Sequence, residues 1–90
     1  MNESFNTQML NLFKKAKTYR DRTAIQCSGK EFTYAHLDDR SDAIASFLLG
    51  VQADLKEERV GLFVTPDIHY VEALWGIWKA GGIAVPISLS

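Results

Sequence analysis

Cysteine is almost absent from this sequence. Cys27 is the only one among 90 residues, so the chain cannot form a disulfide with itself. Small secreted domains usually depend on several disulfides, whereas a single thiol fits a reducing compartment. The start of the chain, Met1–Ser4, also lacks the basic residues and the apolar run of a signal peptide. We therefore expect a cytoplasmic protein.

An excess of one charge and a long apolar run are also missing. The formal net charge is −1, whereas a dedicated nucleic-acid-binding protein needs a basic excess to neutralise phosphates. No stretch approaches the roughly 18 consecutive apolar residues of a membrane-spanning helix. With 47% hydrophobic and 23% charged residues, the composition is that of a soluble globular protein. We expect one domain or part of one, with no nucleic-acid partner.

The first periodic pattern predicts a helix over residues 8–19. Apolar residues recur there at i, i+3, i+4 and i+7, which places them on one helix face. These residues are Met9, Leu12, Phe13 and Ala16. Asn6 or Thr7 could cap the helix. Lysines occupy the opposite side, so the helix either docks on its own domain or lies on an anionic membrane. The short apolar stripe favours docking.

A β-hairpin is predicted next. Residues 23–28 alternate with the period of two that is typical of a β-strand. We expect Ser28–Glu31 to form a two-residue turn with Gly29 at its first central position, where a positive φ is needed. Glu31–Phe32 would be the short returning strand.

A second helix is predicted to begin at Thr33, whose hydroxyl can cap the first turn. Phe32 and Leu37 occupy the two positions of a hydrophobic staple, and Gly50 marks the end of the helix. A small and apolar stripe runs along it through Leu37, Ser41, Ile44, Ala45 and Leu48. The outward face is expected to carry Asp38, Asp39, Arg40 and Asp42.

The last third of the chain predicts a strand, a helix and a second strand. Arg59–Val64 and Ile83–Ile87 are short, almost wholly apolar runs, which suit strands buried on both sides of a parallel sheet. Thr65 would cap the intervening helix, with Pro66 as its first residue, and Gly81–Gly82 would end it. Its buried side is expected to hold Tyr70, Val71, Leu74, Ile77 and Trp78.

The predicted fold class is therefore α/β, with an N-terminal helix, a β-hairpin, a helix and then a βαβ unit with parallel strands. Nothing marks a domain boundary within residues 1–90. Two parallel strands make a poor independent sheet, because such strands are normally covered by helices on both faces and flanked by further strands. We expect an incomplete part of a larger domain, with exposed apolar surface near Val60–Val64 and Ile83–Ile87.

Two groups of residues together resemble the AMP-forming adenylating enzymes, over roughly residues 22–88. One group is similar to the family's helix motif (F/L)TYxEL, followed by a serine and an alanine on the same helix. The other is similar to its VG…G…KAGG…VPL segment. In this chain they are Phe32–Leu37, Ser41, Ala45, Val60–Leu62, Gly76–Gly82 and Val85–Ile87. The resemblance implies an N-terminal segment of the family's AMP-binding large domain. His36 stands where the family commonly has glutamate, which weakens the reciprocal capping bond.

The resemblance implies an enzyme that joins a carboxylate to AMP from ATP and then passes the acyl group to a thiol. The peptide-synthetase members usually have AYVPLDP where this chain has Ile83–Ser88. This difference favours the acyl-CoA synthetase branch and fatty acid metabolism. ATP, Mg²⁺ and coenzyme A are implied for the parent enzyme, and none of them for this segment.

No catalytic, cofactor-binding or metal-binding residue can be carried over from the family to this sequence. The family's ATP-binding loop is rich in Ser, Thr and Gly and ends in Lys-Gly, and no segment here matches it. Gly29–Lys30 is an isolated dipeptide without the run of backbone N–H groups that cradles a phosphate. The groups that grip the ribose and the acyl-adenylate belong to later parts of such chains. The 90-residue chain alone is therefore predicted to be inactive.

Other reactive residue types have simpler structural explanations. His36 and His69 lie on different predicted helices with only Cys27 as a companion, which is not the spacing of a zinc site. The histidines are expected at the surface and Cys27 in the core. Trp75 and Trp78 could line an acyl slot, but packing of a helix on the sheet is favoured. The aspartates of the second helix are interpreted as a solvated face, because hard cations usually need loop carbonyls as well.

Three functional hypotheses follow. The first is a structural segment of an ATP-dependent ligase, whose partner is the remainder of the parent enzyme. The second is a stand-alone protein-interaction module without catalysis, which binds through exposed strand edges or the tryptophan-bearing helix. The third and weakest is a membrane-surface adaptor that uses residues 8–19. Exposed strand edges also predict self-association of the 90-residue chain.

Overall fold

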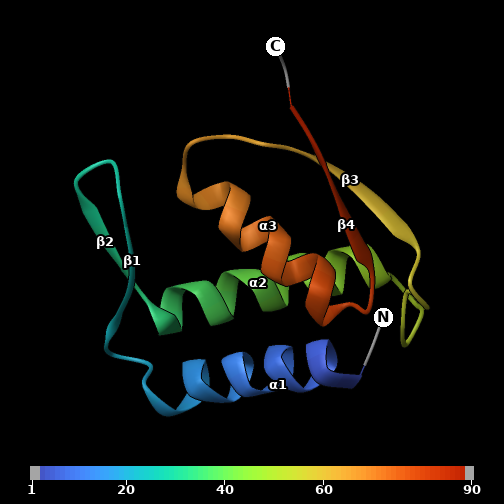
Figure 1. Cartoon of the computed structure of the whole chain (residues 1–90), viewed down its shortest axis with the longest axis horizontal. Helices are drawn as coiled ribbons and strands as arrows, with labels where there is room; N and C mark the ends of the chain where they lie inside the picture. Colours follow the sequence, from blue (N-terminus) through green and yellow to red (C-terminus); the bar gives the residue numbers. More distant parts are fainter. Residues whose placement is uncertain (1–2, 89–90) are drawn as a thin grey trace. The chain divides into compact units, whose positions relative to one another are not determined.

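Figure 1 shows the computed structural model of the chain, in which residues 3–88 are described. Its elements are α1 (Glu3–Thr18), β1 (Thr23–Cys27), β2 (Lys30–Thr33), α2 (Tyr34–Leu49), β3 (Arg59–Phe63), α3 (Ile68–Lys79) and β4 (Ile83–Ile87). The predicted order of elements and the α/β class are confirmed. The chain forms two compact units, Met1–Asp38 and Asp39–Ser90, so the division falls within α2.

Helix α1, in the first unit, starts earlier than predicted. It begins at Glu3 rather than near residue 8, so Asn6 and Thr7 lie inside the helix and neither of them caps it. Asn and Thr lower the stability of a helix by less than about 0.7 kcal/mol relative to alanine when they lie inside it. Because this cost is small, such residues do not reliably mark where a helix starts. The spacing of the apolar residues therefore located the helix but not its first turn.

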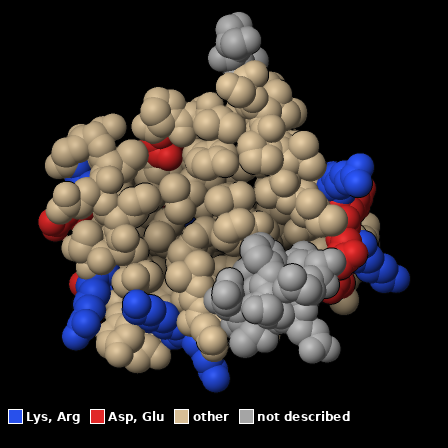
Figure 2. Space-filling model, in the orientation of Figure 1, with Lys and Arg blue, Asp and Glu red and all other residues tan. Residues whose placement is uncertain are grey.

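The described residues of the predicted apolar stripe of α1 are wholly or partly buried. Ala16 is fully buried and Leu12 and Phe13 are half-buried, while the side chain of Met9 lies outside the described ones. Figure 2 shows Lys and Arg side chains gathered at the lower left, where Figure 1 places the end of α1. The arrangement matches a packed helix with a basic outer side. No helix among residues 3–88 is long and apolar enough to cross a bilayer.

Strands β1 and β2 form the predicted antiparallel hairpin, but its turn lies one residue earlier than expected. Cys27 pairs with Lys30, so Ser28 and Gly29 are the central residues, with φ angles of 54° and 79°. Positive φ at both positions defines a type I′ turn, whose twist matches that of the flanking strands. Gly29 therefore occupies the second central position, and the prediction that it occupies the first is wrong.

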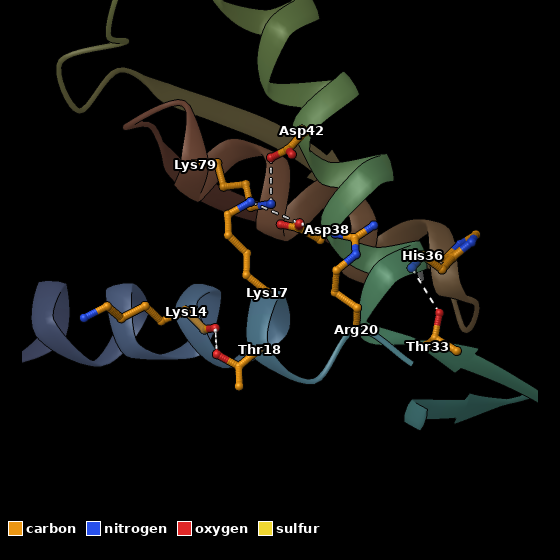
Figure 3. Close-up of polar contacts among 9 residues, drawn as sticks. All are labelled: Lys14, Lys17, Thr18, Arg20, Thr33, His36, Asp38, Asp42 and Lys79. Atoms are coloured by element: carbon orange, nitrogen blue, oxygen red, sulfur yellow. Dashed lines mark hydrogen bonds and ion pairs between the residues drawn. The ribbon is translucent and has the colours of Figure 1, made fainter. Parts of the chain in front are cut away.

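Thr33 caps helix α2 as predicted. The backbone N–H of His36 donates to the Thr33 hydroxyl oxygen across 3.1 Å, as Figure 3 shows. The ring of His36 lies 5.0 Å from the ring of Phe32, and His36 is half-buried rather than fully at the surface. Leu37, the other predicted staple residue, is almost completely buried.

Replacing Thr33 by alanine is expected to lower the free energy of unfolding by about 1 kcal/mol, because an N–H in the first turn of α2 loses its acceptor. Urea denaturation followed by circular dichroism measures the change. Thr18→Ala is a matched control, since its hydroxyl donates to the Lys14 carbonyl at the exposed end of α1. We expect the control to change stability by less than about 0.5 kcal/mol. Equal losses in the two variants would contradict the capping role.

In the second unit, β3 and β4 pair in parallel as predicted, with Arg59 opposite Ile83. The ladder extends beyond both ends of the strands. The Ile83 N–H donates to the Glu58 carbonyl at 2.9 Å, and the Val64 N–H donates to the Ile87 carbonyl at 3.0 Å. Helix α3 packs against both strands, which completes the βαβ unit.

Helix α3 begins later than predicted. Its N-cap is Asp67 rather than Thr65, and Pro66 lies outside the helix. The Asp67 carboxylate accepts from the His69 backbone N–H at 3.0 Å and from the Thr65 hydroxyl at 2.9 Å. The negative charge of a carboxylate interacts favourably with the positive end of a helix, whereas a hydroxyl group carries no charge. The threonine therefore supports the cap instead of forming it.

The end of α3 agrees with the prediction. Gly81 has a φ of 83°, its N–H donates to the Trp78 carbonyl, and the Gly82 N–H donates to the Ile77 carbonyl. These two bonds form a Schellman motif, which needs a residue with positive φ just beyond the helix.

The segment between α2 and β3, interpreted as a polar link, contributes to the core. Leu55 is buried in a cluster with Ala45 and Ala80, and its N–H donates to the Ala80 carbonyl at 2.9 Å. Leu55 stands between two charged residues in the sequence, so no apolar pattern indicated that it is buried. The link therefore fastens the start of β3 to the end of α3.

Helix α3 is buried on two sides, whereas the sequence pattern identified only one. Of the predicted side, Ile77 is buried and the other four residues are half-buried. The buried residues are Ile68, Glu72, Trp75, Gly76 and Ile77. A Cβ atom at Gly76 would lie 2.7 Å from the Cβ of Ile44 on α2. The side of α3 that carries Gly76 therefore packs closely against α2.

The parallel sheet is covered on one face only. Alternate residues such as Val60, Leu62 and Ala84 are half-buried, and α3 packs on both strands. The opposite face, called the open face below, consists of Phe63, Ile83, Val85 and Ile87, which are 58%, 36%, 39% and 44% exposed. The predicted exposed apolar surface is confirmed. Burial of the strands on both sides is not found among the described residues.

Candidate functional site

The Gly29–Lys30 dipeptide forms the plain hairpin turn predicted for it. Gly29 is a central residue of the type I′ turn, and Lys30 is the first residue of β2, paired with Cys27. A phosphate cradle needs several consecutive backbone N–H groups directed at one point. The backbone of Lys30 is instead part of a strand, so this dipeptide does not match an ATP-binding loop.

The acidic residues of α2 do not share one environment. Asp39 and Asp42 are exposed, as predicted for a solvated face, but Asp38 is buried, with an exposed fraction of only 1%. Among residues 3–88, no group of three or more His, Cys, Asp or Glu side chains could hold a metal ion.

Asp38 is the centre of an ion-pair cluster in the first unit. The Arg20 guanidinium donates to Asp38 Oδ2 at 3.0 Å and the Lys17 ammonium donates to the same oxygen at 3.2 Å, as Figure 3 shows. The Ala35 N–H also donates to the Arg20 carbonyl at 2.9 Å. Asp38 therefore joins the start of α2 to the end of α1 and the turn after it. This is a structural role, and the prediction that Asp38 faces outward is wrong.

Glu72 is a second buried carboxylate, in α3 of the second unit, and the sequence interpretation missed it. Its side chain is 2% exposed; Oε1 lies 3.0 Å from His69 Nδ1 and 4.0 Å from Arg40 Nε. The His69 side chain is 76% exposed, as predicted for a surface histidine. A signal was present, because Glu72 lies between Ile68 and Trp75 at helical spacing, on a stripe that is otherwise apolar. The carboxylate therefore links α2 and α3.

A further ion pair joins the same two helices in the second unit. The Lys79 ammonium donates to Asp42 Oδ1 at 2.8 Å, and Figure 3 shows the two side chains meeting. Lys79 was predicted only to suit the last turn of its helix. Its side chain is largely buried, whereas that of Asp42 is more than half exposed. Both Glu72 and Asp42 therefore act in helix packing.

The tryptophans agree with their predicted packing role, whereas the cysteine does not. Trp75 is buried and Trp78 is half-buried, in agreement with the packing interpretation. Cys27 ends β1 and is only half-buried, so the prediction that it fills the core is wrong. A strand that is paired on one side in a two-stranded hairpin has no deep interior to fill.

The fold places the chain first in a structural class: an α/β domain segment in which a helix, an antiparallel hairpin and a second helix precede a parallel βαβ unit. The N-terminal subdomain of NpsA from Klebsiella oxytoca has this fold over 87% of the chain, with a TM-score of 0.73 and 20% sequence identity. The match spans 20% of that protein chain.

The chain belongs to the AMP-binding enzyme family, whose sequence profile matches residues 12–90. It is 38% identical over 80 residues to a mitochondrial malonate–CoA ligase of Mus musculus. It is 40% identical over 70 residues to a medium/long-chain-fatty-acid–CoA and 3-oxocholest-4-en-26-oate–CoA ligase of Mycobacterium tuberculosis. These matches cover 84% and 76% of this chain but only 14% and 12% of the two enzymes. The chain is thus homologous to a part of AMP-forming CoA ligases.

Proposed function

We propose that this chain is a structural segment of an AMP-forming acyl-CoA ligase. In the parent enzyme, ATP and Mg²⁺ would serve to activate a carboxylate as an acyl-adenylate, and the acyl group would then pass to coenzyme A. The segment would build part of the sheet of the large domain and supply none of the reacting groups. Its partner would be the remainder of the enzyme.

The open face of the βαβ unit carries this proposal. Parallel sheets are normally covered on both faces, yet Phe63, Ile83, Val85 and Ile87 remain exposed opposite α3. Phe63 is exposed by more than half, which leaves a large aromatic side chain in water. Since the chain spans 14% of the mouse relative, the rest of such an enzyme offers ample chain to cover this face.

The polar clusters support a structural rather than a chemical role. Asp38 holds two cations within the first unit, and Glu72 lies beside His69 and Arg40 within the second. In each cluster the carboxylate is buried while its partners reach the surface. Such pairs fix the relative positions of backbone segments. A general base or a nucleophile would instead need its reactive atom within reach of a substrate.

The chain alone is expected to show no carboxylate-dependent exchange of pyrophosphate into ATP. The assay would use acetate, malonate, octanoate and benzoate at millimolar concentration, with Mg²⁺ present. The full-length mouse malonate–CoA ligase, assayed with malonate, is the positive control. Exchange by the 90-residue chain above the rate without carboxylate would refute the proposed role, because the segment would then contain its own adenylation site.

A further inference from the structure

Half of the basic residues of the chain lie in one short stretch. Residues 14–22 contain five of the ten lysines and arginines and a single acidic residue, Asp21, so their net charge is +4. The rest of the chain contains five basic and ten acidic residues, which gives it a net charge of −5. Such an asymmetry of charge is typical of a protein that presents one part of its surface to an anionic partner.

The structure places these cations at the surface of α1 and of the turn that follows it. Lys14 and Lys15 are exposed, and Figure 3 shows the Lys14 side chain directed away from Asp38. The Lys17 and Arg20 side chains donate to Asp38 but remain 64% and 42% exposed. The basic side of α1, as the term is used below, consists of Lys14, Lys15, Lys17, Arg20 and Arg22.

Packing of α1 does not use up the basic side. The buried stripe of the helix contains Ala16, which is fully buried, and Leu12 and Phe13, which are half-buried. The lysines lie outside that stripe and are exposed. The sequence set docking of α1 on its own domain against contact with an anionic membrane, but the two use different sides of the helix. Both are therefore compatible in one structure.

The basic side also differs in kind from the open face of the sheet. An apolar surface gains stability when further protein covers it, so the length of the chain accounts for the open face. Burial of a cation is strongly unfavourable unless an anion pairs with it. A cluster of exposed cations is therefore a feature of the outer surface, and only an anionic partner matches it.

An exposed leucine indicates the kind of anionic partner. Leu10 is 65% exposed, and Lys14 and Lys17 follow it at i+4 and i+7, on the same side of the helix. A leucine among lysines suits the surface of a lipid bilayer, where anionic headgroups lie beside apolar acyl chains. A nucleic acid or an acidic peptide offers charge but no such apolar layer.

We propose that the basic side of α1 binds the surface of an anionic lipid membrane, with the helix lying along the surface and Leu10 in the headgroup region. Binding is peripheral and depends on salt, because the attraction of lysines to anionic lipids falls off within a Debye length, about 8 Å at physiological ionic strength. Membrane binding goes beyond the proposed function, since a segment of a ligase builds its sheet with or without a membrane. Its failure would leave the structural role intact, whereas pyrophosphate exchange by the chain would refute only that role.

Sedimentation of the 90-residue chain with sucrose-loaded vesicles tests the proposal. The vesicles contain phosphatidylcholine alone or phosphatidylcholine with about 40% phosphatidylserine, whose headgroups give the surface a negative potential. We expect the chain to sediment with the anionic vesicles at about 0.02 M salt and to be released at about 0.5 M salt, where the charges are screened. Absence of binding at low salt, or equal binding to phosphatidylcholine alone, would overturn the proposal.

Variants of the basic side locate the contact. Lys14→Gln with Lys15→Gln should weaken binding at least about tenfold, because each lysine near an anionic surface contributes about a factor of five. Lys30→Gln with Lys56→Gln is the matched control: it removes the same charge from exposed positions outside α1 and should change binding less than about twofold. Equal losses in the two double variants would show an effect of net charge alone and would contradict a specific basic side.

Leu10→Ala distinguishes a lipid surface from other polyanions. This variant keeps the net charge and should weaken vesicle binding at least about threefold, because the affinity of a surface-bound helix grows with the apolar area that it buries. Circular dichroism verifies that each variant is folded before sedimentation. Unchanged vesicle binding by Leu10→Ala would overturn the assignment to a membrane and indicate an acidic macromolecule as the partner.

Discussion

Replacing Gly76 by alanine is expected to lower the free energy of unfolding by about 2 kcal/mol, although alanine is the better helix former. A Cβ at this position would lie 2.5 Å from Ile44 Cγ2, 2.7 Å from Ile44 Cβ and 3.3 Å from the Ser41 carbonyl oxygen. The Ile44 Cβ is fixed to its backbone, so α2 and α3 must move apart. Overpacking costs about 1–3 kcal/mol, and contacts as short as these belong at the upper end of that range. About 2 kcal/mol of the loss therefore remains after the gain of about 1 kcal/mol in helix propensity.

Urea denaturation of Gly76→Ala, of Ala43→Gly and of the wild type separates the two effects. Ala43 lies on the exposed side of α2, and its replacement should cost about 1 kcal/mol through propensity alone. Ile44→Ala combined with Gly76→Ala removes one of the two overlapping atoms, so the double variant should lose less stability than the sum of the single variants. An increase in stability for Gly76→Ala would contradict the close helix contact.

Removing both cations beside Asp38 is expected to be more damaging than removing Asp38 itself. Lys17→Met with Arg20→Met leaves the buried carboxylate without these partners, which should cost about 3–5 kcal/mol. Asp38→Asn should cost only about 1–3 kcal/mol. The two costs differ because the partners differ in exposure. The Lys17 and Arg20 side chains are 64% and 42% exposed, so they remain hydrated when Asp38 is replaced. Asp38 is only 1% exposed, so water cannot replace the two cations when they are removed.

The single variants Lys17→Met and Arg20→Met complete a double-mutant cycle for this cluster. Each should cost less than about 1 kcal/mol, because the remaining cation still neutralises Asp38. The double variant should therefore lose more than the sum of the two. Lys14→Met with Lys15→Met removes two exposed lysines from the same helix and should leave stability nearly unchanged. A double variant of Lys17 and Arg20 that is no worse than the sum would refute the dependence of Asp38 on this pair.

The sequence predicted the order and type of the elements well, because periodicity and capping residues act locally. Thr33, Gly50 and Gly81 mark helix ends through interactions within a few residues. The errors at Asn6 and Thr65 also concern local choices, between residues of similar capping strength. The turn residues Ser28 and Gly29 differ from the predicted pair by one position, since the register depends on both strands.

Contacts between distant segments could not be predicted from local patterns. Asp38 is an acidic residue beside other acidic residues, and its burial depends on cations that lie 18 and 21 positions earlier. Glu72 and Gly76 face α2 because α3 packs against both that helix and the sheet. A single stripe of apolar residues indicates one buried side, so the second side was missed.

The prediction of the candidate site depended on the family resemblance more than on the residues themselves. Composition and spacing argued against a metal cluster and against a phosphate loop around Gly29. The expected activity of the parent enzyme rested on the resemblance of the segments Phe32–Leu37 and Gly76–Gly82 to the family. Their match to the AMP-binding enzyme family is confirmed. The segments of relatives that correspond to this chain make up 14% and 12% of those enzymes.

Exchange of the corresponding segment in mouse malonate–CoA ligase for this chain tests the structural role most directly. The measurement is the ratio of kcat/KM for malonate to that for other carboxylates, which does not depend on the fraction of folded chimera. A segment that supplies only part of the sheet should leave this ratio unchanged. A folded chimera that prefers another carboxylate would contradict the account, because residues of this segment would then select the substrate.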